Sequence, residues 1–308
     1  MQLPVAGVVP VLETPFHDDG EVDRDGFARM VRAVVGAGVA GVMFPGFASE
    51  FASLTDEERD DLTVMLLELT AHVPGLTRVI SIPDHATVVA VRRGRRAIEL
   101  GADAVNILPP YRLATGRNAV RSHIVAIARA VAPHPVVLQY APLLTGTALD
   151  AESIAAMAAE VTNLVEVKVE STPPGALIAE LRAQTPSIPS AVGNAGVHLI
   201  DALRRGAAGV QPGCSFPEIY LRIWELWHAG DEGAATALHG RLLPYISYWM
   251  QSIDLVIAAE KHISMRRGWF ASDHCRAPAR GLDEEERRMV DRFLAEFADL
   301  LGTSPLRE

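Results

Sequence analysis

The chain of 308 residues has few of the features that mark disulfide-rich, membrane-spanning or nucleic-acid-binding proteins. Its two cysteines, Cys214 and Cys275, lie too far apart to indicate a disulfide framework or a metal knuckle. No apolar stretch is long enough to span a bilayer, and no N-terminal segment has the pattern of a signal peptide. The formal net charge of −10 argues against nucleic acid or an anionic membrane as the main partner. The composition predicts a soluble cytoplasmic protein.

Lysine is also nearly absent, because Lys168 and Lys261 are the only lysines among 28 Lys and Arg residues. Lys168 lies in a Val-rich run, residues 164–170, that predicts a buried strand. Burial removes the hydration of an ammonium group and favours the neutral amine, which attacks carbonyl carbons to form a Schiff base. Alternatively, Lys168 is a surface charge at the strand end or a partner of Glu166 or Glu170. A GC-rich coding sequence would also explain the scarcity of lysine.

The chain does contain a regular alternation of strand-like runs and helical periods up to about residue 230. The predicted strands are short and apolar on both faces, as a buried parallel sheet requires; they are 5–12, 41–44, 78–82, 104–108, 135–140, 164–169, 188–192 and 209–211. The predicted helices are 23–38, a segment that begins at Thr55, 86–100, 118–132, 150–161, 175–184, 197–205 and 217–228. Thr55 and Glu58 have the spacing of a capping box.

Eight strand–helix units fit a closed (β/α)8 barrel better than an open doubly wound sheet. No Gly-x-Gly-x-x-Gly motif follows the first predicted strand, which also argues against a dinucleotide-binding sheet. The sequence therefore predicts an α/β protein with a (β/α)8 TIM barrel in residues 1–230. The strand signals then stop, and residues 231–308 are expected to form a C-terminal extension of three helices packed on the barrel, at 234–251, 255–268 and 283–301.

A (β/α)8 enzyme places its active site at the carboxyl ends of its strands. The second predicted strand is followed by Phe47-Ala48-Ser49, whose backbone N–H groups are suited to an anion, although an ordinary turn is the simpler interpretation. The later strands carry or lead to a set of polar or small residues, namely Tyr111 and Arg112, Tyr140, Lys168, Gly193 and Asn194, and Gln211. Tyr140 and Lys168 fall on neighbouring strands, and a phenol beside an amine can transfer the protons that imine formation requires.

Several of these segments recur together in one known group of proteins. They are residues 7–16 (Gly-Val-Val-Pro-Val-Leu-Glu-Thr-Pro-Phe), the 46–50 loop, Pro110-Tyr111, Tyr140 followed by Thr145-Gly146, Val167-Lys168-Val169 and Gly193-Asn194. Over nearly its whole length the chain resembles the dihydrodipicolinate synthase/N-acetylneuraminate lyase superfamily. The resemblance implies a cofactor-free, metal-free class I lyase that joins or splits pyruvate-type 2-oxo acids through a lysine Schiff base. It implies Lys168 as that lysine, Tyr140 as the proton-shuttling tyrosine, and a homo-oligomer, either a dimer or a dimer of dimers.

The chain departs from the family pattern at three places. The usual hydroxyl pair of the strand-two loop is replaced by Phe47-Ala48, the second tyrosine of the synthase by Arg112, and its arginine by Leu144. Dihydrodipicolinate synthase activity is therefore not expected. The backbone N–H groups of Ala48 and Ser49, with the Ser49 hydroxyl or Arg112, are candidates for binding the substrate carboxylate. Phe47 is expected to shape the pocket towards an apolar part of the substrate.

Three functions remain open from the sequence. The favoured one is an aldolase or dehydratase of a 2-oxo acid, in which Lys168 forms the imine and Tyr140 transfers protons. The second is a catalytically silent relative that binds a small 2-oxo acid in a regulatory or structural role; the lost polar side chains favour it and the retained lysine and tyrosine oppose it. A metal-dependent aldolase is the third, but no histidine pair at i, i+4 lies at a strand end, and His85 is interpreted as a rim residue.

Overall fold

The computed structural model describes residues 5–111, 116–146 and 148–302. Its contacts divide the chain into two compact units, each built from three separate stretches of sequence. We call the first the barrel unit, because it holds all eight strands; it comprises Met1–Val9, Ala40–Phe44 and Val73–Gln211. We call the second the helical unit; it comprises Pro10–Val39, Pro45–His72 and Pro212–Glu308. The predicted boundary near residue 230 stays a prediction.

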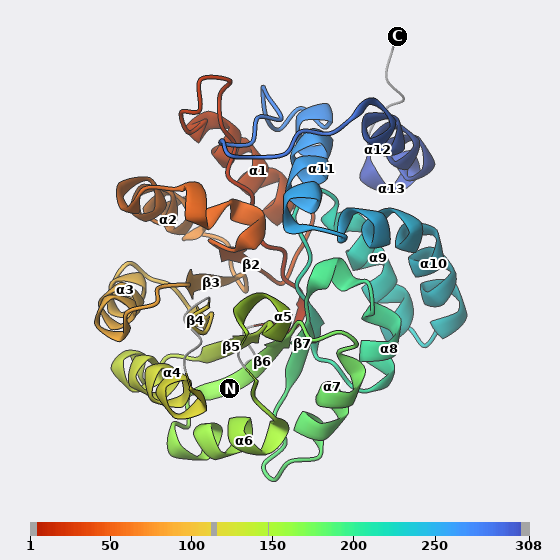
Figure 1. Ribbon diagram of the computed structural model, residues 1–308. Coiled ribbons are helices and arrows are strands. Elements are labelled where there is room, and N and C mark those ends of the chain that lie inside the picture. The colour runs from red at the N-terminus through yellow and green to blue at the C-terminus, as the bar shows by residue number, and fades with distance from the viewer. Residues whose placement is uncertain (1–4, 112–115, 147, 303–308) are drawn as a thin grey trace. The chain divides into compact units, whose positions relative to one another are not determined.

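The barrel unit is built on a parallel sheet in the order β1-β8-β7-β6-β5-β4-β3-β2 (Figure 1). The edge strands β1 and β2 are bridged through Ala40, whose N–H donates to Val8 O at 3.0 Å and whose carbonyl accepts from Thr77 N at 3.0 Å. The sheet is therefore a nearly closed barrel, and the predicted (β/α)8 fold class is confirmed. The strands are β1 (Gly7–Val8), β2 (Gly41–Phe44), β3 (Thr77–Ile82), β4 (Ala104–Ile107), β5 (Val136–Tyr140), β6 (Leu164–Val169), β7 (Ser190–Val192) and β8 (Gly209–Val210).

Except for the first, the predicted strands agree with the structure to within about two residues at each end. β2 and β6 have the predicted bounds; β6 is rich in valine, a residue that favours strands. The run 5–12 forms a strand only at Gly7–Val8. Pro10 has no N–H to donate to a ladder, and beyond it the chain keeps only an isolated bridge between Val11 and Gly213.

The helices of the barrel unit follow its strands in the order that the fold requires. Consecutive helices contact one another, as in α3 with α4 and α6 with α7. One short helix, α5, was not predicted from the sequence; it begins at Pro142, a favoured first helical position, and ends at Gly146 with a φ of 68°. The helices are α3 (Thr87–Glu99), α4 (Arg117–Val131), α5 (Pro142–Thr145), α6 (Ala151–Glu160), α7 (Gly175–Arg182) and α8 (Leu199–Arg204), with the 3-10 turn η3 (Asn194–Gly196).

The helical unit contains the remaining helices. The predicted capping box is confirmed, because Glu58 N donates to Thr55 Oγ1 and Thr55 N donates to Glu58 Oε2. The last predicted helix is in fact two, since Phe297 leaves the helical conformation between them. The elements are α1 (Arg24–Gly36), η1 (Phe47–Ser49), η2 (Phe51–Ser53), α2 (Asp56–Thr70), α9 (Pro217–His228), α10 (Glu232–Trp249), α11 (Ile253–Arg266), α12 (Glu284–Glu296) and α13 (Ala298–Leu301).

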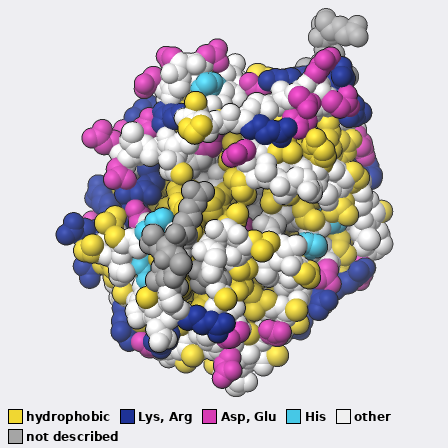
Figure 2. All heavy atoms as spheres, in the orientation of Figure 1, with side chains coloured by type: hydrophobic (Ala, Val, Ile, Leu, Met, Phe, Trp, Pro, Cys, Tyr) yellow, Lys and Arg dark blue, Asp and Glu magenta, His cyan; other side chains and the backbone are white. Residues whose placement is uncertain are grey.

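The surface carries both signs of charge, and acidic and basic side chains are intermixed on the face shown in Figure 2. Among the helices of the described residues, none combines the length and the apolar character needed to cross a membrane. Within the same residues, no group of three or more His, Cys, Asp or Glu side chains is arranged to hold a metal ion.

Glu166 is an unusual residue in the barrel, because its carboxyl group is fully buried. Its Oε2 accepts a hydrogen bond from Val5 N at 2.8 Å, whereas its Oε1 has no hydrogen-bond partner among the described residues. Burial raises the pKa of Glu166 to about 7, and the Val5 N–H opposes this only in part. The unfolded chain therefore loses this proton at lower pH than the folded chain does.

Glu166→Gln should make the protein less sensitive to rising pH. In the parent, the stability contributed by the uncharged acid is complete below the unfolded pKa of about 4.5 and is lost as pH rises through about 7. This loss is on the order of 3 kcal/mol. A neutral amide cannot ionise and can still accept from Val5, so urea unfolding should show a smaller decrease in stability between pH 5 and pH 8. Equal decreases in the parent and the variant would contradict the assignment.

Candidate active site

Strand β6 and the residue that follows it place three charged side chains on one face of the sheet. Side chains alternate along a strand, so Glu166, Lys168 and Glu170 share a face while Val167 and Val169 occupy the other. Lys168 Nζ lies 3.1 Å from Glu170 Oε1, and the two side chains are 4% and 9% exposed. Lys168 is therefore a buried amine paired with a buried carboxylate, and the interpretation as a surface charge is wrong.

Glu170 is held by a chain of buried amides that crosses four strands. Gln139 Nε2 on β5 donates to Glu170 Oε2 at 2.7 Å. Asn106 Nδ2 on β4 donates to Gln139 Oε1 at 2.9 Å and to Ser81 Oγ on β3 at 2.9 Å. Asn106 is completely buried and Gln139 nearly so. The carboxylate beside Lys168 therefore has a fixed position, because each group that holds it is itself held.

The turn after β7 is shaped around Glu170. A Cβ atom at Gly193 would lie 2.4 Å from both Cγ and Oε1 of Glu170, so a larger residue at this position would displace the carboxylate. Asn194 and Ala195 both adopt left-handed conformations, with φ of 50° and 48°, which is costly for residues other than glycine. Asn194 Nδ2 donates to the backbone oxygen of Glu170 at 3.2 Å. Both predicted residues, Gly193 and Asn194, thus lie against the Lys168–Glu170 pair.

Tyr140 is the last residue of β5 and is buried. Its hydroxyl oxygen accepts a hydrogen bond from Leu149 N at 3.3 Å, which leaves its own proton available to another acceptor. The register aligns Tyr140 with Val169 and Gln139 with Lys168. The hydrogen bonds of the described residues thus connect Gln139, rather than Tyr140, to the carboxylate beside Lys168. The role of Tyr140 as a proton shuttle stays a prediction.

The structure places Tyr111 and Gln211 in the segments that follow β4 and β8. Tyr111 packs edge-on against the His85 ring, with 4.2 Å between ring centroids. Gln211 is buried, and neither its amide oxygen nor its amide nitrogen has a hydrogen-bond partner among the described residues. An unsatisfied buried amide is suited to a bound polar molecule. Arg112 lies outside the described residues, and substrate contacts of all three stay predictions.

The loop with Phe47, Ala48 and Ser49 belongs to the helical unit and forms the 3-10 turn η1. The Ser49 hydroxyl donates to Leu12 O and accepts from Gly46 N, while the Ser49 N–H donates to Gly46 O. The N–H of Ser49 therefore has its partner inside the loop, whereas its hydroxyl links the loop to Leu12. Phe47 packs on the Phe51 ring at 5.4 Å. Substrate binding by these three residues stays a prediction.

The helical unit contains its own buried charges, which have structural roles. Lys261 is fully buried, pairs with Glu50, donates to His274 O at 2.8 Å and lies 4.3 Å above the Phe16 ring. Beside it, burial raises the pKa of Glu13 well above its usual value and raises that of Glu260. Lys261 is thus held in place by an anion, a carbonyl and an aromatic face.

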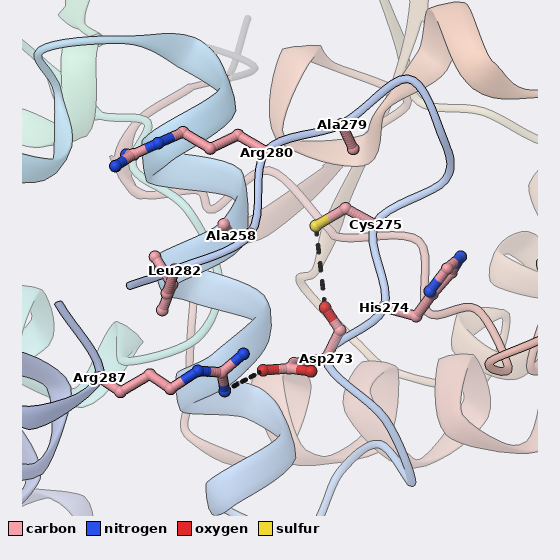
Figure 3. A pocket seen from close by; sticks show the side chains of 9 residues that line it. Ala258, Asp273, His274, Cys275, Ala279, Arg280, Leu282 and Arg287 are labelled. Carbon is pink, nitrogen blue, oxygen red and sulfur yellow. Dashed lines mark hydrogen bonds and ion pairs between the residues drawn. The ribbon is translucent and has the colours of Figure 1, made fainter. Parts of the chain in front are cut away.

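A cavity of about 210 Å³ lies in the helical unit (Figure 3). Its two arginines are ion-paired, Arg287 with Asp273 and Arg280 with Glu286, so neither is free to hold an anionic substrate. Burial raises the pKa of Cys275 to about 12, so this thiol is not a nucleophile at neutral pH. The cavity is lined by Ala258, Asp273, His274, Cys275, Ala279, Arg280, Gly281, Leu282 and Arg287. Its composition offers no chemistry comparable to that of the Lys168–Glu170 pair.

Sequence reasoning missed part of the site. The sequence predicts Glu170 only as a possible ion-pair partner of Lys168, and it does not single out Gln139 or Asn106. The signal for Glu170 was present in the alternation of residues 166–170, which places every charged residue on the lysine's face. Gln139 and Asn106 are polar residues inside apolar strands, and polar residues in such positions need buried partners.

The comparisons with known proteins agree with this geometry. The dihydrodipicolinate synthetase family model matches residues 4–297. L-2-keto-3-deoxyarabonate dehydratase of Azospirillum brasilense is 33% identical over 287 residues, 91% of each chain. 4-Hydroxy-tetrahydrodipicolinate synthase of Stenotrophomonas maltophilia is 32% identical over 252 residues, 78% of this chain and 80% of the synthase.

A solved structure gives the same result. Dihydrodipicolinate synthase of Rhodopseudomonas palustris matches with a TM-score of 0.87 and 25% identity, covering 95% of this chain and 97% of the synthase. These relatives favour the predicted lyase over the catalytically silent alternative. The chain therefore belongs to the dihydrodipicolinate synthetase family, as a class I lyase of pyruvate type.

Proposed function

We propose that this protein is a dehydratase of a 2-keto-3-deoxy sugar acid and that it works through a Schiff base at Lys168. Such an acid has a ketone at C2, a methylene group at C3 and a hydroxyl at C4. The Azospirillum brasilense relative carries the name of such a dehydratase, which supports this substrate class. The proposal selects dehydration from the two reactions, aldol cleavage and dehydration, that the sequence left open.

The reaction begins when Lys168 Nζ gives up a proton and attacks C2; the carbinolamine oxygen then takes up that proton and leaves as water, which forms an iminium ion. The iminium withdraws electrons and acidifies the C3–H bonds. A base removes one proton from C3, and the electron pair of that bond forms an enamine. The enamine electron pair then forms a double bond between C3 and C4 and expels the C4 hydroxyl. The hydroxyl takes up a proton and leaves as water. Hydrolysis of the imine releases an unsaturated 2-oxo acid and regenerates Lys168.

One observation carries the choice of dehydration, namely the 3.1 Å separation of Lys168 Nζ and Glu170 Oε1. In the imine, C3 is only two bonds from Nζ, so a carboxylate at this distance is within reach of a C3 proton. The same carboxyl group can then deliver the proton to the departing C4 hydroxyl. Glu170 is therefore assigned as the base and acid, and Lys168 as the nucleophile.

The synthase reaction of other family members is not proposed. Leu144 takes the place of the synthase arginine, and in the structure it is a partly exposed residue of α5. An aliphatic side chain cannot pair with a substrate carboxylate as a guanidinium does. We assign the substrate contacts instead to Gln211, Tyr111, Asn194 and Arg112.

A panel of 2-keto-3-deoxy acids tests the proposal. We expect a product lighter than the substrate by one water, without pyruvate release, and a borohydride-trapped adduct on the peptide that contains Lys168. Pyruvate release without water loss would replace dehydratase by aldolase. Absence of any trapped adduct across the panel and with pyruvate would reject the Schiff-base mechanism.

We also assign the protein to the cytoplasm and to a homo-oligomer, either a dimer or a dimer of dimers. The apolar and aromatic segment 242–250, at the end of α10, supports the oligomer, although the aromatic rings of Tyr245 and Trp249 pack on Phe293 within the helical unit. Light scattering at micromolar concentration measures the oligomeric state directly, and a monomeric mass would reject this assignment.

A further inference from the structure

The buried amides of Asn106 and Gln139 each donate a hydrogen bond in one direction, towards Glu170. This direction follows from the carboxylate at the end of the chain, which accepts. An ionised carboxylate only accepts hydrogen bonds, so Gln139 must turn its NH2 group towards Glu170 Oε2. The carbonyl of Gln139 then faces Asn106 and needs a donor there. Asn106 supplies that donor from its NH2 group, whose second hydrogen goes to Ser81 Oγ. The orientation of each amide is thus set by its neighbour.

Solvent cannot replace these interactions, because Ser81, Asn106 and Gln139 are all nearly or completely buried. If Asn106 stopped donating, the Gln139 carbonyl would be left unpaired in the barrel interior, which is costly. If Asn106 became an acceptor, Gln139 would have to turn over and present its carbonyl to Glu170. Only a protonated Glu170 can donate to a carbonyl. Whether residue 106 donates or accepts a hydrogen bond therefore decides whether Gln139 presents its N–H group or its carbonyl to Glu170.

We propose that Asn106 is a positioning residue that acts through Gln139 to hold a hydrogen-bond donor on Glu170, so that this carboxyl group is ready to accept a proton. This inference deepens the proposed function and rests on it. The Gln139 N–H occupies Oε2 of Glu170, so the substrate proton goes to Oε1, the oxygen beside Lys168 Nζ. Among the described residues, the Asn106 amide nitrogen donates to Gln139 and Ser81 and not to Lys168 or Glu170. It determines, through one intervening side chain, whether the carboxyl group receives a hydrogen bond from Gln139.

Asn106→Asp and Asn106→Leu form a matched pair of similar size that separates this role from a structural one. While the carboxyl group introduced by Asn106→Asp is protonated, its O–H donates to Gln139 and preserves the parental direction of the chain. Once ionised, the same group only accepts, so Gln139 must turn over and Glu170 loses its donor. Burial moves the ionisation of a carboxyl group to higher pH. The side chain introduced by Asn106→Leu cannot ionise and cannot reverse the chain at any pH.

The measurement is the exchange of pyruvate methyl protons with deuterium, followed by NMR as a function of pH. This exchange needs the imine and the base but no dehydration substrate. We expect Asn106→Asp to lose about tenfold or more of its exchange rate as pH rises through the ionisation of the introduced carboxyl group. The parent and Asn106→Leu should show no such alkaline loss, although Asn106→Leu should be slower at every pH.

A pH profile of Asn106→Asp that is parallel to the parental profile would overturn the inference, as would absence of exchange in the parent. Exchange with the expected profiles but without dehydration of any 2-keto-3-deoxy acid would reject the proposed function alone. Circular dichroism checks that each variant folds. If Asn106→Asp does not fold, Gln139→Met is the second variant. It removes the donor to Glu170 and should move the acidic limb of the exchange profile to higher pH; an unmoved limb would overturn the inference.

Discussion

Lys168→Arg should abolish turnover and borohydride-trappable adducts, even though it retains the positive charge beside Glu170. A guanidinium stays protonated at any pH that the protein experiences and cannot attack a carbonyl carbon. Removal of a covalent nucleophile typically costs on the order of 10⁵–10⁶-fold in rate, so activity should fall below detection. Intact-protein mass spectrometry after incubation with pyruvate and borohydride measures the adduct directly.

Lys261→Arg is the matched control, because Lys168 and Lys261 are the only lysines of the chain. Lys261 is held by Glu50, the His274 carbonyl and the Phe16 ring, so it is not expected to form an imine. The control variant should give the same adduct as the parent. An adduct that persists in Lys168→Arg and disappears in Lys261→Arg would move the reactive amine to the helical unit.

Glu170→Gln should separate imine formation from the elimination that follows it. The amide has the shape of the carboxylate and its oxygen can still accept from Gln139, but it cannot remove a proton from C3. General acid–base catalysis contributes about 10²–10⁴-fold, so dehydration should slow by that factor. The pyruvate adduct should still form, because Lys168 is intact. Comparison of the dehydration rate with the adduct yield checks both expectations in one preparation.

Glu180→Gln provides the control for the loss of a carboxylate elsewhere in the barrel unit. Glu180 is an exposed residue of α7, so this variant should dehydrate its substrate at the parental rate. General acid–base catalysis supplies a far larger factor than about threefold in rate. If Glu170→Gln slows dehydration by no more than about threefold, another group removes the C3 proton. Tyr140 is then the next candidate, because its hydroxyl proton is not engaged by Leu149.

The fold was predictable because its signals are local. β-Branched runs such as residues 164–169 and capping residues such as Thr55 specify their elements from a few neighbouring side chains. The errors arose where the structure depends on residues distant in sequence. The 5–12 run contains enough apolar residues for a strand, yet only Gly7–Val8 finds partners in the sheet. The break at Phe297 was missed because the helical pattern of 283–301 continues through it.

The candidate site was predictable only at residues whose type is unusual for their place in the sequence. A lysine in a valine-rich strand stood out, and so did the tyrosine at the end of the adjacent strand. Glu170, Gln139 and Asn106 act together through the register of β4, β5 and β6, which the sequence alone does not specify. The proposed substrate class depends on that relation, because a carboxylate beside the lysine is within reach of a C3 proton.

Because each lysine is buried in a different unit, its labelling can report when the structure around it opens. Lys168 is the single lysine of the barrel unit and Lys261 that of the helical unit, and neither is exposed. Amine-acylating reagents can therefore modify their side chains only when the surrounding structure opens, apart from compounds that fit the Lys168 site. The rate at which each lysine is labelled measures the local unfolding of its own unit, without an introduced probe. Substrates that protect Lys168 alone would thus be distinguished from ligands that stabilise both units.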